Sequence, residues 1–143
     1  MTKVVINAQH GGFSLSHEGV LRYAEIKGLT LYPEEDDLVG SWTFWSYWLV
    51  PEAHRPEEPG DNWHRWTQEQ RIASNKAHDE AQLSPRDIAR DDPALVQLIE
   101  EMGDNANGRV ASLRVVEIPD DADWQIDEYD GLEWVAEKHR TWS

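Results

Sequence analysis

Two adjacent glycines near the N-terminus offer the clearest possibility of chemistry in this sequence. They follow residues 3–6, a short run rich in β-branched side chains that favours a buried strand. Gly11 and Gly12 accept positive φ angles and let a ligand approach the backbone closely. The residues after them have the composition of a helix start, so N–H groups of the turn and of the helix would point to one place. This pattern predicts an anion or phosphate site, and the alternative is a tight turn that only links strand to helix.

Basic and aromatic side chains complete the predicted site. We expect the backbone N–H groups of the turn to meet the anion, and Arg86 or Arg90 to supply a local countercharge. Phe13, Tyr129 or a tryptophan between residues 63 and 66 would stack on a base. The alternative assigns both arginines to a structural ion-pair network with the aspartates that follow them in the sequence.

Composition excludes several classes of function. The chain has 143 residues, and its 28 acidic against 13 basic side chains give a net charge of −15. Such a charge repels nucleic acid and anionic membranes. The absence of cysteine excludes disulfides, thiol catalysis and cysteine-based zinc sites. No apolar run approaches the ~20 residues of a membrane helix, and the N-terminus lacks a signal-peptide pattern, so we expect a cytoplasmic protein.

Catalytic motifs are incomplete. The sequence HGGF at residues 10–13 is similar to the oxyanion loop of esterases, but the matching G-x-S-x-G elbow is missing. There is no Walker loop, no G-x-G-x-x-G and no H-E-x-x-H. We therefore expect neither catalytic turnover nor a metal or other cofactor. A small hydrolase acting on a nucleotide remains an alternative.

Local patterns predict an α+β fold in one domain, residues 1–143, with residues 33–66 as an acidic insertion rich in Trp and Pro. Ser14 or Ser16 is expected to cap the first helix. Asp130-Gly131 is expected to close a C-terminal hairpin of residues 124–129 and 132–137 with a type I′ turn, and the alternative for the last segment is a short C-terminal helix. The expected mixed β-sheet contains strands near 3–8, 29–32, 42–50 and 112–118 together with that hairpin. About three helices are expected, near 16–27, 67–80 and 92–102.

Eight tryptophans are unusual in a chain of this size. The aromatic strand near 42–50 would be bulky on both faces, so it either fills the core or associates with a second subunit. We expect a homo-oligomer formed through residues 41–50 or through the C-terminal tail that ends in Trp142. Trp63 and Trp66, three residues apart, could share one helical face and stack a base, or could pack on the core.

Three stretches resemble a family of small proteins from tailed bacteriophages and prophages. They are INAQHGGFSLSHEGVLRYAE, RDIARDDPALVQLIEEMG and VEIPDDADWQIDEYDGLEWVAEKHRTW, within about the first thirty and last sixty residues. The family has no assigned activity, so the resemblance implies a phage setting alone. At Gln9-His10 the sequence departs from the Cys-Tyr or Cys-Phe of the family. The resemblance draws attention to Asn7, Gly11, Gly12, Phe13, Arg86, Arg90, Asp91, Glu128, Tyr129, Asp130, His139 and Arg140.

These observations together predict a non-catalytic phage accessory protein in the host cytoplasm. It would bind and sequester an anionic small molecule, with a host nucleotide immune signal as the expected ligand. The alternative is an inhibitor of a host protein whose acidic surface imitates nucleic acid. The expected ligand-binding residues are Asn7, Gly11, Gly12, Phe13, Ser14, Arg86, Arg90 and Tyr129.

Overall fold

A computed structural model describes residues 1–39, 42–57, 60 and 63–138. The chain divides into two compact units. The first unit is formed by Met1–Gly28 and Pro85–Ser143, and the second unit by Leu29–Ser84. The second unit contains the predicted insertion 33–66 and extends beyond it at both ends.

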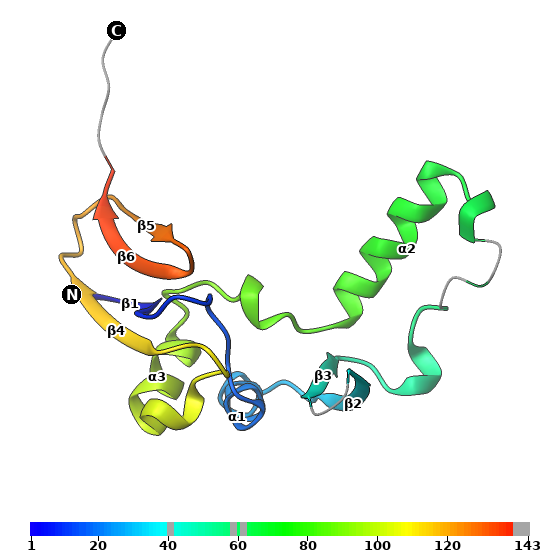
Figure 1. The fold of residues 1–143 in the computed structure, drawn as a ribbon, viewed down its shortest axis with the longest axis horizontal. Coiled ribbons are helices and arrows are strands. Elements are labelled where there is room, and N and C mark those ends of the chain that lie inside the picture. Colours follow the sequence, from blue (N-terminus) through cyan, green and yellow to red (C-terminus); the bar gives the residue numbers. More distant parts are fainter. Residues whose placement is uncertain (40–41, 58–59, 61–62, 139–143) are drawn as a thin grey trace, which may run out of the picture. The chain divides into compact units, whose positions relative to one another are not determined.

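The α-helices and strands of the first unit are β1 (Thr2–Asn7), α1 (His17–Lys27), α3 (Pro93–Met102), β4 (Leu113–Ile118), β5 (Trp124–Tyr129) and β6 (Leu132–Glu137). The unit is built around an antiparallel ladder of β1 and β4, in which Val4 lies opposite Val116. Helices α1 and α3 pack against each other on one side of this ladder, and the hairpin of β5 and β6 lies on the other side (Figure 1). Short 3₁₀ helices cover Pro85–Asp87 and Gly103–Ala106.

The core of the first unit follows from the apolar pattern of its sequence. Val4 and Val5 of β1 are fully buried, as are Leu95 and Leu98 of α3 and Val20 of α1. The α3 residues recur at the three-residue spacing that places side chains on one helical face. Burial of these side chains against β1 therefore holds the strand that leads to the glycine turn.

Asp92 fixes the start of α3. Its carboxylate accepts hydrogen bonds from the Ala94 N–H, the Tyr23 hydroxyl and the Lys27 ammonium. Burial favours the neutral carboxyl, but these three donors outweigh burial and hold the pKa of Asp92 below its ordinary value of 3.8. A carboxyl whose pKa is lowered by folding stabilises the fold above its ordinary pKa, and this contribution is lost as the pH falls through the lowered value.

We expect Asp92→Asn to lower the free energy of unfolding by about 1–3 kcal/mol near neutral pH, because the cap and its ion pair weaken. The difference from the wild-type protein should shrink as the pH falls from about 5 to about 2, where the Asp92 carboxyl becomes protonated. Urea titrations at several pH values measure both effects. Asp91→Asn, at an exposed neighbouring position, is the control. A stability difference that does not change with pH would contradict the assignment.

The second unit contains β2 (Tyr32–Val39), β3 (Trp42–Trp48) and α2 (Gln68–Ala81), with 3₁₀ helices at Glu52–His54 and Trp63–Arg65. The predicted strand 29–32 is wrong in its bounds, because β2 begins at Tyr32 and runs through the acidic stretch. The aromatic strand β3 supplies the antiparallel partner that holds this stretch extended, with Glu35 opposite Trp45. Thr67 caps α2 in a capping box with Gln70.

The α+β class, the three α-helices and the C-terminal hairpin are confirmed. The described strands do not form the expected mixed sheet, because they pair in three separate two-stranded antiparallel ladders. No helix in the described part of the chain is long and apolar enough to cross a membrane. The side chains of 42–44 lie outside the described residues, as do His139, Arg140 and Trp142.

Candidate functional site

The glycine turn lies directly beneath the turn of the β5–β6 hairpin. Gly11 and Gly12 have φ angles of 119° and 96°. The Gly11 N–H donates to the Asp130 carbonyl at 3.1 Å. A Cβ added to Gly131 would lie 2.2 Å from the Gly12 nitrogen, so the two turns touch through their backbones. The Gly11 N–H, expected to meet an anion, is therefore used by the hairpin turn, and the Gly131 backbone lies close to the Gly12 nitrogen.

This contact makes Gly131 a sensitive position. We expect Gly131→Ala to lower the free energy of unfolding by about 2 kcal/mol, because the residue has a positive φ and the new methyl meets backbone. Gly28→Ala is the matched control: Gly28 also has a positive φ, but no atom lies within 4 Å of the added carbon. Thermal unfolding compares the two variants. Equal losses of stability would show that the close contact between the two turns does not contribute to the free energy of unfolding.

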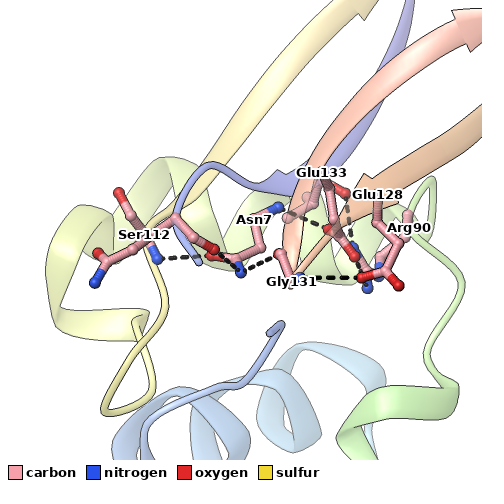
Figure 2. A network of polar contacts seen from close by, with 8 residues as sticks. Asn7, Arg90, Ser112, Glu128, Gly131 and Glu133 are labelled. Carbon is pink, nitrogen blue, oxygen red and sulfur yellow. Dashed lines mark hydrogen bonds and ion pairs between the residues drawn. The ribbon is translucent and has the colours of Figure 1, made fainter. Parts of the chain in front are cut away.

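The Asn7 side chain links the glycine turn to the hairpin turn, and it is fully buried. Its Nδ2 donates to the carbonyls of Gln9 and Gly131, both at 2.8 Å. Its Oδ1 accepts from the Ser112 N–H at 2.9 Å (Figure 2). The predicted ligand-binding role for Asn7 does not fit this geometry, because backbone groups of its own unit use the amide.

Arg90 and Glu133 form a paired charge against β1. Arg90 Nη2 donates to Glu133 Oε2 at 2.9 Å, and Nη1 donates to Oε1. Glu133 Oε1 also accepts the Asn7 N–H at 2.8 Å, while the Arg90 carbonyl accepts the Val5 N–H at 2.8 Å. Glu133 and Arg90 thus provide acceptors for the Asn7 and Val5 N–H groups of β1. Arg90 belongs to a structural network, as one alternative held, but its partner is a glutamate of β6.

A cavity of about 250 Å³ lies beside this pair. It brings together four of the eight predicted site residues, from the glycine turn and from the segment before α3. No residue of α1 contributes to its lining, and the first turn of that helix is capped by the Ser16 side chain. The lining residues are Gly12, Phe13, Arg86, Arg90, Glu128 and Glu133.

The remaining predicted residues lie outside this lining. The Ser14 carbonyl accepts the Gly108 N–H at 2.9 Å, and its side chain packs against that glycine. Tyr129 is 72% exposed and touches the His10 ring edge-on, with ring centroids 6.2 Å apart. Phe13 lines the cavity but is buried, with the Arg90 guanidinium 3.8 Å from its ring centre. The Arg90 guanidinium therefore covers a face of the Phe13 ring on which a base was expected to stack.

Among the four charged side chains that line the cavity, only Arg90 and Glu133 form an ion pair. Glu128 lies opposite Glu133 in the hairpin register, so both side chains project from one face. Arg90 neutralises Glu133, whereas Glu128 only accepts the Gly131 N–H at 3.2 Å. Arg86 is exposed, and no ion pair or hydrogen bond joins it to any other described side chain. The cavity therefore presents one arginine and one carboxylate that the described residues leave unpaired.

Sequence reasoning missed Glu133. The signal was available, because a two-residue Asp130-Gly131 loop fixes the register and places Glu128 opposite Glu133. Two like charges directly opposite each other are unfavourable unless a cation lies between them. That argument predicts a nearby arginine, although not which one.

The second unit holds a smaller hollow of about 140 Å³, lined by Trp63 and Trp66 together with Arg71. The Arg71 guanidinium lies 5.0 Å from the Trp63 ring centre and donates to the His64 carbonyl at 3.1 Å. The predicted stacking of a base on this tryptophan pair would compete with Arg71. The two rings do lie together, as their spacing suggested.

Among the described residues, no three histidine or acidic side chains gather in a metal-binding group. A scan against protein-family models finds no match to this chain. Comparisons with curated proteins and with solved structures find no match either.

Proposed function

We propose that this chain binds a small anionic ligand of the nucleotide class in the cavity beside Gly12. The observation that supports the proposal is Arg86, an exposed cation on the cavity wall to which the described residues give no partner. A protein with a net charge of −15 repels anions at long range, so an anion site needs a local positive charge. Arg86 supplies that charge, because distant exposed acids are screened beyond ~8 Å at physiological salt.

Arg90 gives the cavity a planar surface. Its guanidinium lies on Phe13, and its hydrogen-bonding edge is held by Glu133. A guanidinium plane held in this way can stack on a nucleobase, as arginine does in many nucleic-acid complexes. A volume of about 250 Å³ is close to the lower end of small-ligand sites, ~300–1,000 Å³, and suits one end of a nucleotide.

The phage resemblance sets the proposed role in an infected cell, where the protein would withhold a nucleotide signal from the host. Sequestration needs affinity without turnover, and the cavity offers no nucleophile activated by a neighbouring base. Its residues are two arginines, two glutamates, a glycine and a phenylalanine.

We expect the full chain to bind at least one member of a panel of mono-, di- and cyclic nucleotides in calorimetry. Arg86→Gln should weaken that binding about tenfold or more, because a charge-assisted bond to the anion is lost. Arg114→Gln is the matched control, since Arg114 is exposed in the same unit but does not line the cavity. Equal affinity in both variants would place the anion elsewhere.

The same samples separate sequestration from hydrolysis. After denaturation of the protein, chromatography should recover the bound nucleotide unchanged. Recovery of a cleaved product would make the protein an enzyme, and failure of the whole panel to bind would favour inhibition of a host protein through the acidic surface.

A further inference from the structure

We infer that Glu128 selects the base of the ligand, and that the preferred base carries two adjacent N–H donors, as guanine does. This inference rests on the proposed function of the same cavity. It concerns which nucleotide enters, whereas the proposed function concerns only the anionic group and its arginine.

The first step is the direction of the Glu128 side chain. Glu128 and Glu133 are direct partners across the hairpin, and both line the cavity. Figure 2 shows Glu128 beside Arg90 and Glu133. The Glu128 carboxylate therefore faces the space that a base would occupy.

The second step is what the protein leaves unused on that carboxylate. Glu133 accepts three hydrogen bonds, two from Arg90 and one from the Asn7 N–H. Glu128 accepts one, from the Gly131 N–H to Oε2. Its Oε1 has no donor among the described residues, and an ionised carboxylate has about four lone-pair sites for donors.

The third step is the chemistry that fits. A carboxylate accepts hydrogen bonds and donates none, so it favours a base edge that presents donors. Guanine offers the N1–H and the N2 amino group side by side, which pair with a carboxylate in a bidentate way. Uracil presents two carbonyl oxygens around its single N–H, and their lone pairs would face the negative charge. Hypoxanthine keeps the N1–H but lacks the amino group, and so separates the two contributions.

The inference is tested by calorimetry of the full chain with three nucleotides that share one phosphate group: GMP, IMP and UMP. We expect GMP to bind at least tenfold tighter than UMP, with IMP between them, because the carboxylate accepts from both N–H donors of guanine but meets the carbonyl lone pairs of uracil. Glu128→Gln should reduce the ratio of GMP to UMP affinity to about threefold or less, because an amide offers only one acceptor and adds a donor.

Two features keep the variant interpretable. The glutamine Oε1 can still accept the Gly131 N–H, so the hairpin turn retains its hydrogen bond. Asp127→Asn is the matched control, because Asp127 lies opposite Trp134 and projects from the other face of the hairpin.

Each outcome decides the question. A preference for GMP that disappears in Glu128→Gln and persists in Asp127→Asn supports the inference. Equal affinity for the three nucleotides, a preference for UMP, or a preference that survives Glu128→Gln overturns it, while binding that depends on Arg86 still supports the proposed function. Absence of binding to all three, with the wider panel also failing to bind, overturns both.

Discussion

Replacing Asn7 with leucine is expected to lower the free energy of unfolding by about 4 kcal/mol, one of the two largest losses expected for a substitution in this chain. The Asn7 side chain is 0% exposed and makes three hydrogen bonds to backbone groups. Leucine has a similar volume but leaves those groups without partners. Each buried polar group left unsatisfied costs about 1–3 kcal/mol, so the losses add to a large part of the stability of a small domain.

The measurement is equilibrium unfolding in urea, with Asn105→Leu as the matched control. Asn105 lies in the same unit and is exposed, and its side chain makes no hydrogen bond to another described residue. The control should therefore change stability little. Because Asn7 holds the Gly131 carbonyl, the variant should also loosen the hairpin, seen as faster amide exchange in β5 and β6. An Asn7→Leu protein as stable as the control would show that the network carries no net energy.

Local sequence signals located most elements of the first unit. Asp130 and Gly131 both have positive φ angles, as the type I′ turn required, and the hairpin around them has the predicted extent. The helix expected near 92–102 begins where Asp92 caps it and Pro93 occupies its first position, which proline suits. These signals work because the turn and the cap each depend on two neighbouring residues.

Longer-range pairing was less accessible to sequence reasoning. No strand was expected over the acidic residues 33–39, yet they form most of β2 because β3 provides the antiparallel partner. Strand propensity depends on the partner as well as on the strand itself. The sequence alone did not reveal that β2 is the strand partner of β3, or that residues 29–84 form a unit of their own.

The candidate site was predicted in part. The glycine turn and the two arginines do meet at one cavity. The sequence could not show that Gly11 already donates to Asp130, because nothing local links a turn at residue 11 to one at residue 130. The paired glycines were interpreted as room for a ligand, but much of that room is filled by another turn of the same chain.

The Arg90–Glu133 pair should show the other large effect. Arg90 and Glu133 have side chains that are 17% and 10% exposed. Removing one member leaves a largely buried charge without its partner, so Glu133→Leu is expected to cost about 3–5 kcal/mol. Arg90→Met should cost a similar amount, because the carboxylate then retains only the Asn7 N–H.

The double variant should be much more stable than the sum of the two single losses predicts, because it leaves no unpaired charge. An apolar pair of similar volume often matches a buried ion pair in stability, so we expect a coupling energy of at least about 2 kcal/mol in the cycle. Urea unfolding of the four proteins gives the coupling energy. The corresponding cycle at Lys3 and Glu100, an exposed ion pair of the same unit, is the control and should show little coupling. If the Arg90–Glu133 cycle is as nearly additive as the control, the pair does not hold the hairpin against β1.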